Sequence, residues 1–515
     1  MRRFLLRALV LLGLSIALIW PALLNHGPFV FPDTRTYMRA ADAIVSKLTH
    51  RKTAWTAADD HPVADGGQTA NNSDQALHNL GVVRTRSLSE ISKKGVILGR
   101  SPYYGMLLYI GAITGGFWLT MLLQAGALLL TLSLALRGLG YPVWPILGYL
   151  TLALCVVSDA AFFTSYLMPD VFAGIAILLC ALLLSVRSRL DRTDLVLCYL
   201  LLTTTMLFHD SCTLISVSLL GFAILVGLFR RSWISWRRLG IVLLAVITAY
   251  AGQSVIALGV KRATGEAPLR LPFISARLIA DGPGTNYLRA TCPGSHFILC
   301  EYVNEFPMGS EDFLFAAKPG KSVFELASYD QRRAISAEQV HFLFAVIKYD
   351  PVAVLKSSAR NAGTQLIDFT LKEFRYSLGF KDALDRTLPL QALAQVRGTA
   401  AYLGTMPVGF LSVVLYIAVF GSLVYLLLAF SGRLPGRRAG DGLKMVACWV
   451  FAGIVLNAAI TGCLSVVIPR FQARVIWLIP LCALLLEAQV WIDRNASVFS
   501  AKKSEEPRGQ AIGIT

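Results

Sequence analysis

The chain has 515 residues, of which 55% are hydrophobic and 15% charged, and its mean hydropathy is +0.59. The apolar residues are grouped into long runs instead of being spread as in a soluble core, which indicates a protein that crosses a membrane several times. The formal net charge of +17 would also suit a nucleic-acid-binding protein. Most of the surplus Arg and Lys, however, lies in short connectors between apolar runs. That distribution is typical of membrane topology and excludes nucleic acid as the expected partner.

The first apolar run covers residues 4–24. It has the roughly 20 residues that a spanning helix needs and lacks a clear small-residue cleavage site, so we interpret it as an uncleaved anchor. A polar turn then carries Asp33, which follows the rigid Pro32. Apolar residues at helical spacing predict a helix over 35–48 that lies on the membrane surface. Residues 49–99 are polar, show no sustained apolar period and predict a long loop.

The remaining apolar runs predict an all-α polytopic membrane protein with about ten transmembrane helices. A shorter run at 103–113 is a possible partial insertion beyond these ten. The other nine runs lie at 117–136, 143–157, 171–186, 195–208, 213–229, 239–258, 408–430, 446–468 and 475–491.

Basic residues determine the predicted orientation, because they gather in alternate connectors and so place those connectors and both termini in the cytoplasm. The opposite face then receives every candidate functional residue. We find neither an internal repeat nor the inverted hydropathy symmetry of many transporters. The predicted division is an N-terminal transmembrane module (1–259) with a long first outer loop (25–102), an outer-face, mainly helical domain (260–405), C-terminal transmembrane helices (406–492) and a cytoplasmic tail (493–515).

The predicted outer-face domain contains two helix signals and one pair of cysteines. Ser336 and Gln339 have the spacing of a capping box at the start of one helix, and 351–367 reads as a second helix. Cys292 and Cys300 lie in this polar segment, on the oxidising side of the membrane. We therefore predict a disulfide between them, provided that their geometry permits it.

Three acids near the outer ends of apolar runs are the candidate catalytic residues: Asp33, Asp159 and Asp170. An acid at such an end is less costly than one at the middle of the bilayer, so each is also explained as a simple boundary residue. Asp170 follows Met168-Pro169 at a helix start, where the helix dipole favours a carboxylate.

Six more residues of the outer face are candidate substrate-binding residues. Two of them are arginines ahead of the last helix that oppose the positive-inside trend, so we expect an anionic group to hold them. Arg100 and Tyr103 belong to a proline turn that combines a cation with interfacial aromatics. His209 and Asp210 interrupt two apolar runs, where a hydrated turn is the simpler explanation. The six are Arg100, Tyr103, His209, Asp210, Arg470 and Arg474.

No metal site and no soluble cofactor are predicted. The histidines and acids of the loop at 49–99 match no ligand spacing. Walker, dinucleotide-binding and nucleophile-elbow motifs do not occur in a suitable context.

Together these features resemble the GT-C class of membrane glycosyltransferases, which use polyprenyl-phosphate sugars and include protein mannosyltransferases and lipid A aminoarabinose transferases. The resemblance rests on the order of short motifs over about the first 230 residues and the last two helices. Residues 31–37 are similar to the first outer loop of the class, which implies that Asp33 is at or near the general base. Residues 100–103 resemble the basic-Pro-Pro turn before the second helix, with Ser101 in place of the first proline.

Three further motifs take part in the resemblance. Met168-Pro169-Asp170 is similar to the second acidic site of the class, and His209-Asp210 stands where many members have an arginine and an acid. The segment that begins with Arg470 and Arg474 looks like the basic and aromatic start of the last helix.

The resemblance implies an enzyme of the bacterial inner membrane with its active site facing the periplasm. It would transfer a hexosyl or pentosyl group from a polyprenyl-phosphate donor to an envelope glycan, lipid or protein acceptor. Two alternatives stay open: a transporter or flippase of lipid-linked saccharides, and an O-antigen polymerase or ligase. A transporter needs ionisable residues at mid-bilayer depth, whereas the apolar runs here are nearly uncharged.

Overall fold

The computed structural model describes residues 2–49, 53, 55, 99–316 and 322–495. Within these residues every regular element is a helix, and two isolated β-bridges join extended residues. The all-α prediction is therefore confirmed for this part of the chain. The predictions for the loop at 49–99 and for the tail at 493–515 fall almost entirely outside it.

Six helical segments are long and apolar enough to cross a membrane, so the chain has the helices of a multi-pass membrane protein. Three shorter apolar helices accompany them at Phe4–Leu18, Val143–Val157 and Val171–Leu184. The six are α6 (Trp118–Leu139), α11 (Asp210–Phe229), α12 (Trp236–Thr264), α21 (Val408–Phe430), α22 (Asp441–Leu464) and Pro469–Arg494, which comprises α23 (Pro469–Ile476) and α24 (Leu478–Arg494).

Helix α9 (Val171–Leu184) occupies the centre of the bundle, and all 14 of its residues are buried. It packs against α6, α10, α11, α12, α22 and α23. Large apolar side chains such as Phe229, Tyr250 and Phe410 are instead exposed on the outer helices, as expected where helices face lipid. The other helices of this part are α1 (Arg2–Leu18), α2 (Trp20–Leu24), α3 (Pro32–Thr49), α5 (Pro102–Gly115), α7 (Val143–Val157), α8 (Ala160–Thr164), α10 (Arg192–Phe208) and the 3-10 turn η1 (Arg231–Trp233).

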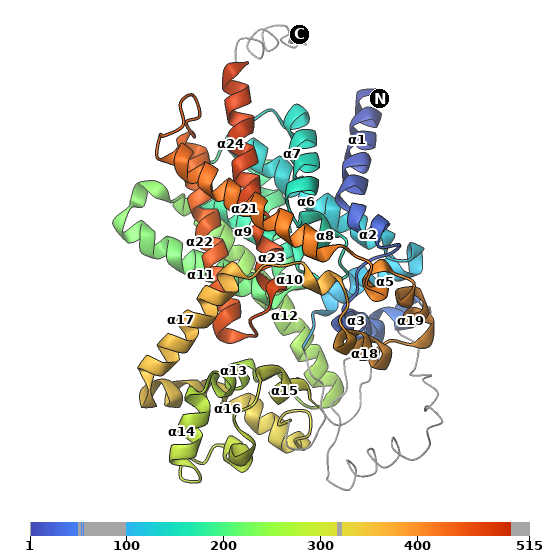
Figure 1. Cartoon of the computed structure of the whole chain (residues 1–515), viewed down its shortest axis with the longest axis vertical. Helices are drawn as coiled ribbons and strands as arrows, with labels where there is room; N and C mark the ends of the chain where they lie inside the picture. The colour runs from blue at the N-terminus through green and yellow to red at the C-terminus, as the bar shows by residue number, and fades with distance from the viewer. Residues whose placement is uncertain (1, 50–52, 54, 56–98, 317–321, 496–515) are drawn as a thin grey trace, which may run out of the picture.

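The start of α1 and the end of α24 lie at one end of the molecule, and a small helical unit lies at the other (Figure 1). This unit has its own hydrophobic core, formed by residues such as Phe313, Phe324 and Phe342. Cys292 and Cys300 form a disulfide within it. Its helices are α13 (Phe273–Asp281), α14 (Pro283–Thr291), η2 (Ile298–Glu305), α15 (Ser310–Phe315) and α16 (Tyr329–Tyr349), and α17 (Pro351–Ile367) leads from it to the bundle.

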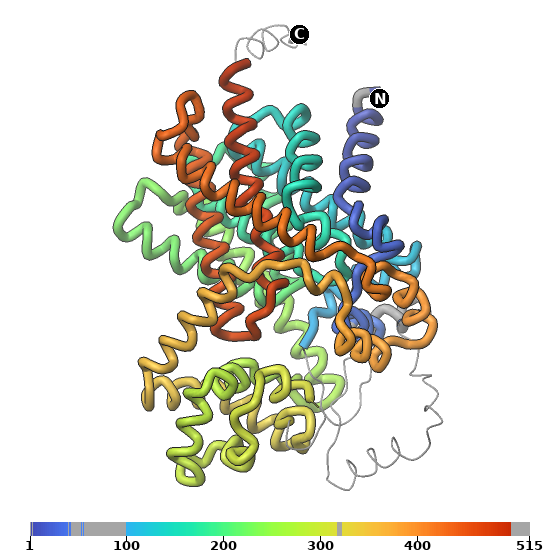
Figure 2. Tube along the Cα trace, viewed as in Figure 1, coloured from blue at the N-terminus to red at the C-terminus, as the bar shows by residue number. Residues whose placement is uncertain are grey.

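The segment predicted as one outer domain, 260–405, is divided between two cores. Phe369, Phe374, Tyr376 and the apolar residues that follow belong to the large core of the transmembrane helices. In the tube view this part of the chain returns to the helix bundle (Figure 2). Its short helices are η3 (Lys372–Phe374), α18 (Leu378–Thr387), α19 (Leu390–Arg397) and α20 (Ala400–Leu403).

Several helix boundaries differ from the prediction. The helix predicted over 35–48 begins earlier, at Pro32, because proline is well suited to a first helical turn. The capping box predicted at Ser336 is wrong: α16 begins at Tyr329, with Ser328 and Gln331 as its capping box. Ser336 lies inside the helix and donates to the carbonyl oxygen of Arg270 at 2.6 Å.

Candidate functional site

The turn after the first helices is attached to the loop between α8 and α9. The backbone N–H of Phe29 donates to the oxygen of Ser165 at 3.0 Å, and the N–H of Leu167 donates to the oxygen of Phe29 at 2.9 Å. The hydroxyl of Thr34 accepts from the N–H of Phe31 at 3.0 Å and donates to the oxygen of Leu167 at 3.1 Å. These bonds hold the start of α3 against the loop that leads into the central helix α9.

Asp33, in the first turn of α3, forms an ion pair with Arg100. Their side chains are 24% and 22% exposed, respectively, so both can be reached from outside the bundle. Burial opposes the charge on Arg100, but the neighbouring Asp33 carboxylate outweighs it and raises the pKa of Arg100. Close packing of α3 on α5 depends on Gly105, since a Cβ there would lie 2.0 Å from the carbonyl oxygen of Tyr37.

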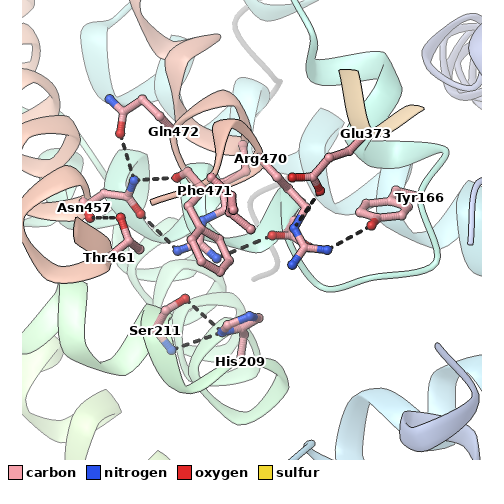
Figure 3. A network of polar contacts seen from close by, with 12 residues as sticks. Tyr166, His209, Ser211, Glu373, Asn457, Thr461, Arg470, Phe471 and Gln472 are labelled. Carbon is pink, nitrogen blue, oxygen red and sulfur yellow. Dashed lines mark hydrogen bonds and ion pairs between the residues drawn. The ribbon is translucent and has the colours of Figure 1, made fainter. Parts of the chain in front are cut away.

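Arg470, in the first turn of α23, contacts residues from three other parts of the chain, of which Figure 3 labels Tyr166 and Glu373. It donates to the hydroxyl of Tyr166 at 2.9 Å and lies 3.5 Å from the carboxylate of Glu373. Its guanidinium also stacks over the ring of Phe31 at 4.1 Å, which links it to the segment that carries Asp33.

Arg474 lies one turn further along α23 and is completely buried. Its guanidinium pairs with Asp170 at 3.5 Å and donates to the side-chain oxygen of Asn457 at 3.0 Å. Asp170 is 1% exposed, so this pair is shielded from solvent, unlike the pair of Asp33 and Arg100.

Hydrogen bonds from two other helices fix the position of α23. The side chain of Gln365 accepts from the N–H of Ile468 at 3.1 Å and donates to its oxygen at 2.8 Å. Asn457, in α22, donates to the oxygen of Phe471 at 2.7 Å. At the end of α23 the indole of Trp477 lies directly over Gly174 of α9, where a Cβ would come within 2.5 Å of it. The two arginines are thus presented by a firmly held helix.

His209 lies at the junction of α10 and α11, and its Nδ1 accepts from the N–H of Ser211 at 3.1 Å. Burial lowers its pKa well below the ordinary value, and the charges of Arg474, Arg100 and Arg470 lower it further. The charges of all three arginines therefore disfavour the protonated form of the ring. We refer to Arg100, Arg470 and Arg474 together as the arginine cluster.

Two of the predicted binding residues contact α12 instead of the cluster. Asp210 is exposed and accepts from the side chain of Gln253 at 2.8 Å. The hydroxyl of Tyr103 donates to the carbonyl oxygen of Gly252 at 2.8 Å. Both contacts attach neighbouring helices to α12.

Asp159, the third candidate acid, is completely buried at the junction of α7 and α8. Neither of its carboxylate oxygens has a hydrogen-bond partner in the described part of the chain. Burial raises its pKa well above the ordinary value, and no nearby cation opposes this shift. Asp159 therefore does not share the electrostatics of the arginine cluster.

The structure adds residues that sequence reasoning missed. Glu373 comes from η3, in a segment that the sequence assigns to the outer domain, and no motif marks it. Tyr166 belongs to the connector before Asp170, where an aromatic residue is unremarkable. Asn457 could have been found from the sequence, because an amide within an apolar spanning run requires an internal partner.

The site is rich in positively charged hydrogen-bond donors. Among the described residues, the Nε atoms of Arg100, Arg470 and Arg474 and the Nε2 atom of Gln472 are buried without a hydrogen-bond acceptor. Burial raises the pKa of Glu373, although Arg470 opposes this shift. Within the same part of the chain, no group of three His, Cys, Asp or Glu side chains could hold a metal ion. The arrangement is suited to an anionic ligand.

Comparison of the chain with protein-family models, with characterised proteins and with solved structures yields no match.

Proposed function

We propose that this protein is a membrane glycosyltransferase of the GT-C class that transfers a sugar from a polyprenyl-phosphate donor to a hydroxyl of an envelope glycan, lipid or protein. One observation carries the proposal: an accessible carboxylate, Asp33, is paired with Arg100 and connected through Phe31 to the buried Arg470. A base and a set of phosphate-binding groups thus occur side by side within a bundle of membrane helices.

In the proposed reaction, the acceptor oxygen attacks the anomeric carbon of the donor while its proton passes to the carboxylate of Asp33. The bond from that carbon to the phosphate oxygen breaks, and polyprenyl phosphate leaves with one more negative charge. Arg100 and Arg470 stabilise this charge with donors that act in a water-poor site. A single displacement of this kind inverts the anomeric centre.

The buried acids have supporting roles in this proposal. Asp170 holds Arg474, and Arg474 with Asn457 holds the helix that presents Arg470. Asp159 has no cation beside it and no exposed surface, so it takes no part in the transfer. The guanidinium groups of Arg100 and Arg470 supply the charge that a metal ion supplies elsewhere, and the proposed reaction uses neither a metal nor a soluble cofactor.

The proposal places the protein in the inner membrane of a bacterium, with the site facing the periplasm. Its support is the gathering of basic residues in the alternate connectors. The start of α1 and the end of α24 also lie at the end of the molecule opposite the disulfide-containing unit (Figure 1). In this arrangement α1 with α2, α7, α9 and α10 complete ten spans beside the six longer segments.

The test is sugar transfer from a synthetic polyprenyl-phosphate donor by purified protein in detergent. Asp33→Asn keeps the size of the side chain but removes the proton acceptor, so turnover should fall by at least about a hundredfold. Asp382→Asn, which changes an exposed acid of α18, serves as the matched control. A folded Asp33→Asn protein with near-normal turnover would contradict the assignment of the base. In a parallel assay with the protein in phospholipid vesicles, donor translocation without transfer would favour a flippase.

A further inference from the structure

The turn between α16 and α17 exposes large apolar side chains to an unusual degree. On α16, Val340, Phe344 and Ile347 are 49%, 64% and 37% exposed, and their spacing of four and three residues places them along one face. On α17, Val352 and Leu355 are each 72% exposed. We call these five side chains the elbow patch. An exposed apolar patch of this kind marks a surface that another apolar phase covers.

Helix α17 has the reverse of the amphipathic pattern found in a water-exposed helix. Its polar residues Ser357, Asn361 and Gln365, at successive intervals of four, are buried against the bundle. Asn361 donates to Asp281 at 2.7 Å, and Gln365 bonds the backbone of Ile468. The opposite side carries the exposed part of the elbow patch. Such inversion is expected of a helix whose outer side faces lipid.

The position of α17 beside a spanning helix identifies the phase that covers it. Along much of its length α17 packs against α22, which is long and apolar enough to cross a membrane (Figure 1). The approach is close, since a Cβ on Gly462 would lie 2.9 Å from the backbone of Asn361. These contacts lie in the last turn of α22, so the outer side of α17 adjoins the lipid-facing surface at the end of that helix.

Exposed cations and a tyrosine border the elbow patch. Lys348, Lys356 and Arg360 are exposed, and Tyr349 is 50% exposed. Long basic side chains and tyrosine are the residues that occupy the boundary between lipid tails and phosphate groups. A docking surface for a soluble protein has fewer lysines near its apolar centre.

We propose that the elbow patch is inserted into the phospholipid layer that surrounds the spanning helices. Val352, Leu355 and Phe344 contact acyl chains, while Lys348 and Lys356 bind the lipid phosphates. The small helical unit that contains the disulfide thereby rests on the membrane beside α22 instead of projecting freely into water. The inference does not depend on the proposed catalytic activity.

The test uses the unmodified full-length protein in phospholipid vesicles and a photoactivated carbene reagent that dissolves in the acyl-chain region. Peptide mass spectrometry should find labelling of residues 340–355 comparable with that of the exposed residues Phe410 and Ile417 of α21. The first turn of α16, which contains the exposed Asp330, should stay unlabelled. In the double variant Val352→Glu/Leu355→Glu, labelling of 340–355 should be lost while labelling of α21 is retained.

Labelling of 340–355 only by a water-soluble reagent would overturn the proposal. So would protection from both reagents together with chemical cross-links at Lys348 or Lys356 to a second polypeptide, because a protein would then cover the patch. Retained labelling of α21 shows that the bundle has inserted and folded, so a negative result at the elbow patch remains interpretable.

Discussion

The buried ion pair of Asp170 and Arg474 leads to a prediction about the stability of the protein. Arg474→Met keeps the length of the side chain but leaves the carboxylate of Asp170, 1% exposed, without its cation. Removal of one partner from a buried ion pair costs about 3–5 kcal/mol. The double variant Asp170→Leu/Arg474→Met replaces both charges with apolar groups. Its loss of stability should therefore be smaller than that of Arg474→Met alone.

The free energy of unfolding can be measured by titration with sodium dodecyl sulfate in mixed micelles, followed by circular dichroism. Arg333→Met is the control, since it removes a surface pair with Glu266 whose side chains are 57% and 37% exposed, and it should cost less than about 1 kcal/mol. If Arg474→Met is no more destabilising than Arg333→Met, the buried pair does not hold α23 as we infer. If the loss of stability in the double variant equals the sum of the losses in Asp170→Leu and Arg474→Met, the two side chains are not coupled.

Three other predictions concern the site and its supports. Gly105→Ala should reduce transfer, because its Cβ would collide with the backbone of Tyr37 and displace Asp33 from Arg100; full activity would show that α3 can move without harm. Because burial raises the pKa of Asp159, the folded chain keeps a proton that the unfolded chain releases above about pH 4. Stability then falls as pH rises, by at most about 1.4 kcal/mol per pH unit, and Asp159→Asn should remove this slope from thermal unfolding curves. Arg470→Ala should lower transfer by about a hundredfold, and Arg470→Lys should restore only part of it, since lysine lacks the bidentate fork; equal activity of lysine and arginine would argue against phosphate binding there.

Sequence reasoning located the charged residues because their positions depart from the usual distribution of charge in a membrane protein. In the predicted topology Arg470 and Arg474 stand on the face where arginines are depleted. The structure pairs each of them with a carboxylate. Sequence reasoning could not pair these arginines with Glu373 or Asp170, because partners about a hundred or more residues apart leave no periodic signal. The capping box was misplaced for a related reason: Ser328 and Gln331 have the same spacing as Ser336 and Gln339, and only tertiary packing distinguishes them.

Domain boundaries were hard to predict because a polar segment outside the membrane helices can either form a separate domain or pack against those helices. Hydropathy marks 260–405 as lying outside the membrane helices, but not which of its residues pack against those helices. Short polar helices such as α18 bury few apolar residues each, so the pattern of each one alone resembles that of a surface loop. The elbow patch shows the opposite problem, because α17 was predicted as a helix without its inverted amphipathy being recognised.

Contacts with residues 376–401 explain how a turn near the start of the chain can hold the proposed catalytic carboxylate in place. The hydroxyl of Tyr376 accepts from the N–H of Val30 at 2.8 Å and donates to its oxygen at 3.1 Å. The side chain of Asn25 accepts from the N–H of Ala401 at 2.8 Å. Without these contacts the two residues before Pro32 would be free to rotate, and Asp33 would lose its fixed distance from the arginine cluster. The site is therefore complete only when residues 25–37 and residues 376–401 have folded together, which ties its geometry to that of the bundle.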